Sequence, residues 1–399
     1  MIERYLNIAR EVIDLSLKQG AEQVSVSLAN ATSFQLEVRN QNIEALKEAG
    51  SSGIHVTLAK NQKRSTLSSN DFRLETLEPL IRSTLEALPL MGEDPFYTLP
   101  DPKLQGKAEI DLQFRDPNFE KMASNEKINE LMLLEKEALS IDSRLQTEEI
   151  SFSDSISYMV HGDSNGFLEG CSKTLCSQGV SMFAEDGGEE TEGSSQSLNT
   201  GRKQSDGWYS SSRFRKDLES REDLARKAGE RTLRKLGSVK PKSCEVPVVF
   251  STEMAQSFLG SLASAMMGDN VFRKHSFLKD SLGETVANPE IRLSDEPLLP
   301  GKLGSRHYDN EGVKATPLML IDQGKLLSFM CSTYSANKLD RQSTGHAGGI
   351  SNLMLKPGNY SDEELIASID NGLYLTGMSG QGVNLTTGDY SRGAQGLWI

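Results

Sequence analysis

The chain has 399 residues, of which 37% are hydrophobic, and its mean hydropathy is −0.43, which is the composition of an ordinary soluble protein with two or three domains. Its formal net charge of −13 argues against broad binding to nucleic acids or anionic membranes, because both need a basic surface, although local basic patches are compatible with it. Four scattered cysteines are too few to indicate a disulfide framework, so we expect a reducing compartment.

No segment has the pattern of a targeting signal or a membrane helix. The first residues include the charges of Glu3, Arg4, Arg10 and Glu11, which interrupt any apolar signal core. No apolar run approaches the roughly 18 residues that a membrane helix requires. We therefore expect a cytoplasmic protein.

Residues 1–95 predict an N-terminal α+β domain. Residues 2–19 carry an apolar stripe at helical spacing, and Gly20 stands where a helix would end. A second helix is predicted around the apolar positions of 74–85. Alternating apolar and polar residues predict half-buried strands at 24–28, 34–38 and 54–58.

Prolines at positions 89, 95, 100 and 102 stiffen the next stretch and mark the first predicted domain boundary. Residues 110–237 predict a middle, antiparallel β-rich domain that ends in a helix. Within it, a helix over 124–140 precedes strands over 148–183, which turn at Asn165 and Gly166. Residues 185–206 predict either a mobile loop or a polar edge hairpin.

The helix at the end of the middle domain has a clear start and a clear end. Ser220 and Asp223 form a plausible capping pair, and Gly237 follows the last turn. The helix has a basic face, formed by Arg226, Lys227, Arg231, Arg234 and Lys235. In an acidic protein a solvated surface is the favoured interpretation of such a face, and a nucleic-acid site is the alternative.

Residues 241–399 predict a C-terminal mixed α/β domain with an antiparallel sheet. A buried strand at 246–250 leads directly into a helix over 254–267. Two further strands flank a hairpin turn at 322–324. The fold class expected for the whole chain is therefore α+β.

Two glycine-dense blocks, 343–349 and 377–382, lie in the last sixty residues. The second block does not fit a dinucleotide-binding loop, because that motif opens a helix, whereas these glycines lie between two strand-like segments. A sheet connection is the favoured interpretation. Gly380 and Gly382 are candidates for positions where another chain or a ligand approaches the backbone closely.

The best polar cluster is the run RHYDNEG at 306–312. Asp309 and Glu311 would share one face of an extended chain, which suits a bound cation or general acid–base catalysis. The favoured alternative is a turn whose carboxylates cap backbone amides or pair with Arg306. His346, which lies among glycines, is a further catalytic candidate, although no two of the five histidines stand at metal-ligand spacing.

Several of these segments resemble the TldD/PmbA family, also called the modulators of DNA gyrase. The resemblance is specific over residues 245–399 and looser, by order of elements, over the N-terminal half. The matching motifs are SFLKDSLG at 276–283, SRHYDNEGV at 305–313, STGHA at 343–347 and VNLTTGDYSRGA at 383–394.

The resemblance implies a cytosolic heterodimeric zinc peptidase that trims or degrades unfolded or modified peptides. In this family the TldD-type subunit carries His-Glu-x-x-x-His on a helix and a later cysteine, whereas the PmbA (TldE) type lacks them. The matching helix here, 254–267, has no histidine, with Gly260, Ser261 and Ala265 near the motif positions, and 373–388 has no cysteine. The resemblance therefore implies a subunit with no catalytic residues and no zinc of its own, whose TldD-like partner holds the metal.

Two other functions remain open at this stage. The family's older name suggests a regulatory protein that acts on DNA gyrase, and a small-ligand enzyme would use Asp309, Glu311 and His346. Members of the family also continue beyond the position of Ile399, so we expect the C-terminal domain to be truncated there.

Overall fold

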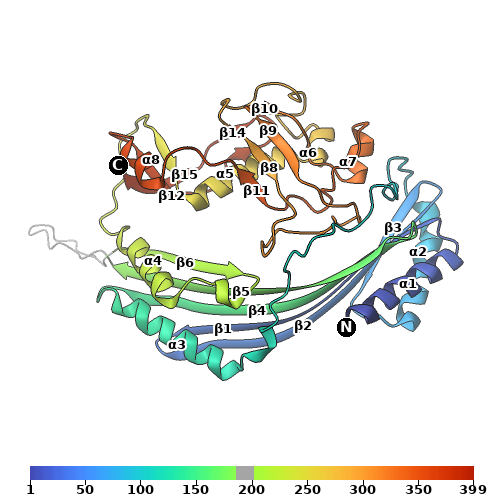
Figure 1. The fold of residues 1–399 in the computed structure, drawn as a ribbon, viewed down its shortest axis with the longest axis horizontal. Helices are drawn as coiled ribbons and strands as arrows, with labels where there is room; N and C mark the ends of the chain where they lie inside the picture. Colours follow the sequence, from blue (N-terminus) through green and yellow to red (C-terminus); the bar gives the residue numbers. More distant parts are fainter. Residues whose placement is uncertain (186–201) are drawn as a thin grey trace, which may run out of the picture.

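The computed structural model describes residues 1–185 and 202–399, and its largest element is one curved antiparallel sheet (Figure 1). The sheet has six strands in the order β3-β2-β1-β4-β5-β6. The strands are β1 (Gln23–Arg39), β2 (Asn42–Lys60), β3 (Lys63–Ser69), β4 (Gln146–Asp163), β5 (Leu168–Glu185) and β6 (Lys203–Ser212). Because β1 pairs with β4 over nearly its whole length, the N-terminal and middle segments of the chain share this sheet.

The strands are longer than the sequence pattern predicts. The segments 24–28 and 34–38, expected as two strands, are parts of the single 17-residue strand β1. Residues 29–33, which separate them, are small or polar, so the hydrophobic alternation fades while the alternation of faces continues. Similarly, 54–58 is one end of the 19-residue strand β2. The strands expected over 148–183 are two, β4 and β5, joined by the predicted turn at Gly166.

Part of one predicted segment cannot be compared with the structure. Of residues 185–206, expected as a loop or an edge hairpin, 186–201 lie outside the described residues. Lys203 already belongs to β6, which pairs antiparallel with β5 at the edge of the sheet.

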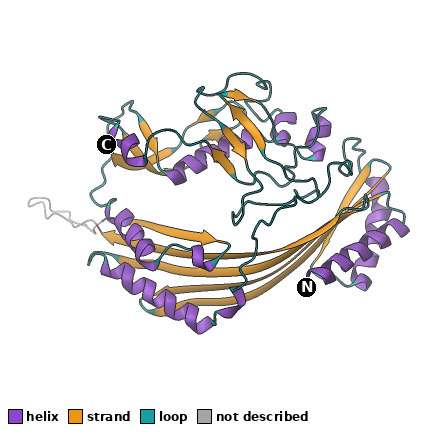
Figure 2. Cartoon of the chain, viewed as in Figure 1, coloured by secondary structure: helices purple, strands orange, loops and turns teal. Residues whose placement is uncertain are grey.

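Four helices pack on one face of the sheet, two at each end (Figure 2). The helices are α1 (Ile2–Lys18), α2 (Leu74–Ala87), α3 (Ser124–Ser140) and α4 (Arg221–Leu233). Helices α1 and α2 bury Val24 and Val26 of β1, whereas α3 and α4 bury Phe34 and Leu36 of the same strand. The even-numbered residues of β1 thus face the helices at both ends of the strand, and Asn30 and Thr32 separate the two apolar patches.

The predicted helix boundaries are confirmed at several points. Helix α3 spans the predicted residues 124–140, and Gly20 follows α1 with a φ of 102°. The Ser220 side chain accepts a hydrogen bond from the backbone N–H of Asp223 at the start of α4. The basic face of α4 is occupied by ion pairs with Glu219, Asp223 and other acids, which agrees with a surface role.

The C-terminal half begins with β7 (Val248–Phe250) and the helix α5 (Thr252–Ala265), as the sequence predicts. A mixed sheet forms where β12 (Leu373–Ser379) pairs parallel with β7 and antiparallel with β15 (Gly393–Trp398). A second sheet has the order β10-β9-β8-β11, and its β9–β10 hairpin turns at the predicted 322–324. The remaining elements are α6 (Gly268–Phe272), β8 (Leu293–Asp295), β9 (Leu318–Asp322), β10 (Lys325–Leu326), α7 (Thr333–Lys338), β11 (Leu353–Leu355), α8 (Asp362–Ala367), β13 (Val383–Asn384) and β14 (Asp389–Tyr390), with the 3-10 helices η1 (Leu88–Leu90), η2 (Phe119–Lys121) and η3 (Arg215–Asp217).

The C-terminal half faces the hollow side of the large sheet, and residues 101–116, here called the strap, run between the two (Figure 1). The strap follows the prolines that mark the predicted boundary, yet it is tightly held. Gly106 and Ala108 donate backbone hydrogen bonds to the carbonyl groups of Gly312 and His307, and Phe114 accepts one from Thr174 of β5. The strap therefore contacts the sheet and the C-terminal half at once.

The architecture confirms the predicted class, a mixed α+β protein with several antiparallel sheets and one mixed sheet. Within the described ranges, no helix combines the length and the apolar character needed to span a membrane.

Glu135 of α3 fixes the β1–β2 turn, which gives a first prediction. Its side chain is fully buried, and its two carboxylate oxygens accept hydrogen bonds from the backbone N–H groups of Asn40 and Gln41, both at 2.7 Å. We expect Glu135→Gln to lower the free energy of unfolding by roughly 2 to 4 kcal/mol, because an amide NH₂ would then face one of these donors.

Urea denaturation measures this loss. The matched control is Glu130→Gln on the same helix, because Glu130 is partly exposed and its contact is an ion pair with Arg221. Equal stability of the two variants would contradict the prediction.

Candidate functional site

A cavity of about 410 Å³ lies between the hollow face of the large sheet and the loop of residues 304–310. Strands β1, β2, β4 and β5 supply one wall, the loop supplies the opposite wall, and Phe114 of the strap stands between them. The loop carries most of the polar run that the sequence singles out. The titratable side chains in the wall are His55, His161, Cys171, Lys173, Arg306, His307, Tyr308 and Asp309.

A row of polar residues crosses the sheet wall. Cross-strand pairing aligns Ser68, His55, Ser27, His161 and Glu169, one from each of β3, β2, β1, β4 and β5. Two hydrogen bonds lie within the row, between the His55 ring and the Ser68 hydroxyl at 2.8 Å and between the Ser27 hydroxyl and His161 at 3.0 Å. These residues share the face opposite to the helices, because their positions are odd-numbered on β1, β2 and β4.

His161 is the buried member of the row. Its ring is 7% exposed and lies 5.8 Å from the ring of Phe167. Burial lowers the pKa of His161 from 6.5 to about 4, and a hydrogen bond to the backbone of Glu311 opposes this shift only in part. The imidazole is therefore neutral near pH 7, so it can offer one donor and one acceptor to its neighbours.

The other titratable groups of the wall are also shifted by burial. Burial lowers the pKa of Lys173, Arg306 and His307 and raises the pKa of Cys171 and Tyr308. A cleft in which several groups are perturbed by desolvation is a candidate functional site. At neutral pH the Cys171 thiol and the Tyr308 hydroxyl stay protonated, because burial raises pKa values that already lie above 7.

The two carboxylates of the predicted cluster have different hydrogen-bond partners. Asp309 is 1% exposed and accepts backbone hydrogen bonds from Glu311, Val313 and Ala347 at 2.9 to 3.0 Å. Glu311 accepts one at 2.8 Å from the backbone of Thr333, at the start of α7. Burial raises the pKa of both carboxyl groups. The geometry agrees with the turn-capping interpretation, in which these side chains fix the loop.

His346 lies outside the cavity wall, in a separate buried network. Its Nε2 is 3.1 Å from Oδ2 of Asp295, and its Nδ1 is 2.8 Å from the carbonyl oxygen of Thr344. Asp295 also accepts hydrogen bonds from the backbone and hydroxyl of Ser351. His346 and Asp295 are 2% and 0% exposed, so this network joins β8 to the first glycine block without facing a substrate path.

The two glycine blocks make close contacts within the chain itself. In the first, the carbonyl groups of Gly345 and Gly349 accept hydrogen bonds from the Arg306 guanidinium. In the second, Gly380 has a φ of +84° with open space beside it, and a Cβ at Gly382 would collide with the carbonyl oxygen of Ser391. Neither Gly380 nor Gly382 lines the cavity.

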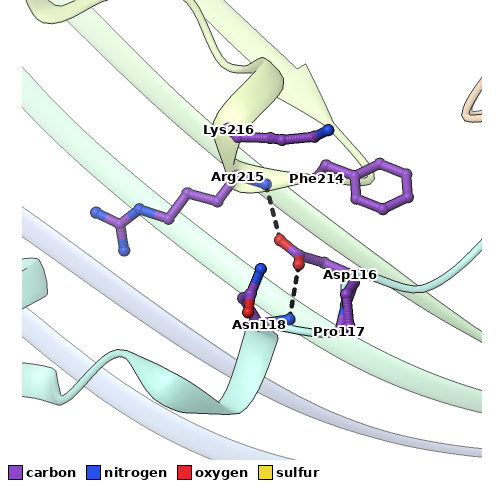
Figure 3. A pocket seen from close by; sticks show the side chains of 6 residues that line it. All are labelled: Asp116, Pro117, Asn118, Phe214, Arg215 and Lys216. Carbon is purple, nitrogen blue, oxygen red and sulfur yellow. Dashed lines mark hydrogen bonds between the residues drawn. The ribbon is translucent and has the colours of Figure 1, made fainter.

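A second hollow, of about 450 Å³, lies where the strap meets the end of β6 (Figure 3). Its Asp116 carboxylate accepts backbone hydrogen bonds from Asn118 at 2.8 Å and Arg215 at 3.1 Å. The carboxylate thus fixes two turns, and the Lys216 side chain near it is exposed. This hollow offers less chemistry than the cavity above the sheet.

Helix α5, the segment that matches the zinc helix of TldD-type chains, does not fit a zinc ion. Its acidic residue, Glu253, pairs with Arg231 at 2.8 Å, and the hydroxyl groups of Ser261 and Ser264 donate to carbonyl groups of the helix itself. Zinc needs imidazole, thiolate or carboxylate ligands, and the middle of α5 offers none. Over residues 1–185 and 202–399, no three His, Cys, Asp or Glu side chains form a group that could hold a metal ion.

Sequence reasoning missed Ser27, His161, Lys173 and Asp295. Ser27 and His161 lie 134 positions apart and meet only through the pairing of β1 with β4. The one signal that could have found them is the run of polar residues at alternate positions of each strand, which marks a second, polar face.

Comparison with known proteins first shows the class of protein that this chain resembles, the metallopeptidases. Residues 117–236 match the PmbA/TldA metallopeptidase central domain, and residues 243–399 match the PmbA/TldA metallopeptidase C-terminal domain. The chain is 32% identical to a metalloprotease PmbA homolog of Buchnera aphidicola, over 99% of the chain and 85% of that relative. It is 29% identical to the metalloprotease PmbA of Escherichia coli O157:H7, over 100% of the chain and 86% of that relative.

The fold agrees with this class. A solved structure from Bacteroides thetaiotaomicron, named as a modulator of DNA gyrase, superposes with a TM-score of 0.89 at 28% identity, over 98% of the chain and 86% of that structure. The chain belongs to the PmbA/TldD metallopeptidase family, as the sequence motifs indicated.

Asp309 gives the second prediction. We expect Asp309→Asn to lower the free energy of unfolding by roughly 1 to 3 kcal/mol, because one of the three backbone donors would lose its acceptor inside the protein. Urea denaturation measures the loss, and Asp280→Asn is the control, because the Asp280 side chain is 84% exposed. A variant as stable as the control would show that the carboxylate is not needed for the loop.

His161 gives the third prediction. The unfolded chain takes up a proton at this histidine near pH 6.5, whereas the folded chain does so only near pH 4. The folded state therefore binds fewer protons between these values, and its stability falls as the pH falls from about 6.5 to 4, by up to about 1.4 kcal/mol per pH unit. We expect His161→Gln to reduce this slope.

Urea denaturation at several pH values between 4 and 7 measures the effect. His55→Gln is the matched control, because His55 lies in the same polar row but is exposed. If His161→Gln and the unchanged protein lose stability equally over this range, His161 does not cause the slope.

Proposed function

We propose that this chain is the PmbA (TldE) type subunit of a cytoplasmic two-chain zinc metallopeptidase and is its non-catalytic member. The observation that supports this proposal is helix α5, which keeps its place after β7 but has no histidine or cysteine, and whose one carboxylate, Glu253, is paired with Arg231. A metal ion activates water in such an enzyme only where ligands hold it. The proposal therefore places the zinc in a TldD-like partner.

In this proposal the chain helps to hold the peptide substrate. The large sheet ends in two edge strands, β3 and β6, to which an extended peptide can add as a further strand. Beyond the cavity, the hollow face carries small polar residues in register across neighbouring strands, among them Ser153, Ser177 and Ser211. Such side chains leave room for a polypeptide backbone and offer hydroxyl groups to it.

The fourth prediction compares the two subunits alone and together. We expect an unfolded peptide to be cleaved when this chain is mixed with a TldD-type subunit, and cleavage to stop when a chelator removes the zinc. We expect the purified chain alone to cleave nothing. Mass spectrometry of the peptide products measures each reaction.

Two outcomes would contradict the proposal. Chelator-sensitive cleavage by the chain alone would assign it a metal site of its own. An unchanged rate when the chain is added to the TldD-type subunit would remove its role in the reaction.

A regulatory role on DNA gyrase is the alternative that the name of the Bacteroides structure suggests. The net charge of −13 does not favour contact with DNA, so such a role would act through protein contacts. Affinity capture with the chain as bait separates the two functions. Recovery of gyrase without a zinc-bearing peptidase subunit would favour the regulatory role.

A further inference from the structure

Two cationic side chains, Lys173 and Arg306, line one end of the cavity, and a third, Arg213, lies near the same Phe114 ring as Lys173. The Lys173 ammonium lies 4.7 Å and the Arg213 guanidinium 5.8 Å from the centre of this ring. Arg306 lines the same cavity, and its positive charge, like that of Arg213, acts on Lys173. The His307 ring stands edge-on to Phe114, with the two ring centres 5.2 Å apart.

None of the three cations forms an ion pair with a carboxylate of the described residues. Instead, they donate to backbone carbonyl groups: Lys173 to Ser305, Arg213 to Thr174 and Leu303, and Arg306 to Gly345 and Gly349. The carboxylate in the wall, Asp309, is already bonded to three backbone N–H groups. The charges of Asp295 and Asp309 offset that of Arg306 in part. Positive charge that is removed from water with so little negative charge nearby is costly, so this cluster is suited to an anion from outside the chain.

Three buried nitrogen atoms near the cavity lack a hydrogen-bond partner among the described residues. Over the residues that the structure describes, Nε of Arg213, Nε of Arg306 and Nδ1 of His307 are buried nitrogen atoms without a hydrogen-bond partner. Lys173 has three donors and uses one of them on a carbonyl group. Buried polar atoms are normally paired, so unpartnered nitrogen atoms of Arg306 and His307 in the cavity wall indicate room for a further hydrogen-bond partner there.

The cavity wall also has apolar members beside its polar row. Ala29 and Met159, at odd-numbered positions on the hollow face, and the Phe114 ring line it beside the cationic end. A volume of about 410 Å³ is within the range of small-ligand sites. The cavity thus fits a molecule with an anionic group at one end and a small apolar group at the other.

We propose that this cavity binds a carboxylate that carries a small apolar group, with the carboxylate at Lys173, Arg306 and His307 and the apolar group against Phe114 and Met159. Two molecules share this chemistry, the C-terminal residue of a peptide and a free small carboxylic acid. The inference goes beyond the proposed function and does not rest on it, because the cavity is formed by this chain alone.

Isothermal titration calorimetry on the purified full chain tests the proposal. The probes are N-acetyl-leucine, N-acetyl-leucine amide, and an acetylated tripeptide that ends in leucine, as the free acid and as the amide. We expect each acid to bind at least about tenfold more tightly than its amide, because a charged acceptor forms the stronger hydrogen bonds. Tighter binding of the tripeptide acid identifies a peptide terminus as the ligand, and equal binding of the two acids identifies a small free carboxylate.

Two variants and a control locate the site. We expect Lys173→Met to weaken binding of the acids about tenfold and to leave binding of the amides unchanged. His307→Gln keeps a hydrogen-bond donor but alters its position. We expect it to weaken binding of the acids by a smaller factor than Lys173→Met does. Lys203→Met is the matched control, because Lys203 is a lysine of β6 in an exposed ion pair with Glu148. Thermal unfolding of each variant shows whether the chain is folded.

Two results would overturn the proposal. The first is that the amides bind as tightly as the acids, or that the acids do not bind at about 10 mM. The other is acid binding that is unchanged in both Lys173→Met and His307→Gln.

Discussion

The side chain of Gln105 joins the two halves of the molecule. Its amide nitrogen donates to the Asp163 carboxylate, at the turn of β4 into β5, and to the backbone carbonyl of Glu311. Around it, the ring of Phe167 packs against Tyr308, with ring centres 5.0 Å apart, and leaves no room for a Cβ on Gly312. The cavity exists because these contacts hold the loop of 304–310 over the sheet.

Local features of the fold could be predicted from the sequence because they depend on neighbouring residues. The stripe of α1 and the Ser220 cap of α4 are set within a few positions of the chain. That β1 is one strand could not be predicted in the same way, because residues 29–33 lack the apolar pattern although they pair with β2 and β4. The composition of a strand indicates which of its faces is buried. Only the pairing with β4 shows that β1 continues through residues 29–33.

The same distinction between local signals and long-range contacts applies to the residues of the candidate site. The sequence identified Asp309, Glu311 and His346 by their residue types, and the structure places all three in hydrogen bonds that hold loops together. Within the described part of the chain, Arg213 and His307 draw their importance from burial and from nitrogen atoms that have no hydrogen-bond partner, which no local pattern reports. A residue type indicates what a side chain can do, whereas its surroundings decide whether that capacity is already used.

The pairing of β1 with β4 also affects how the chain is made. Ser27 and His161 are 134 positions apart, so the hairpin of β1 and β2 leaves the ribosome long before the strand that completes it. During that interval one edge of β1 presents unpaired backbone groups, which is the condition that favours aggregation of nascent β-sheet proteins. Contacts of such long sequence separation also slow folding, because a large loop must close before they form. The feature that creates the polar face of the site therefore also leaves a strand edge unpaired until residue 163 has been synthesised.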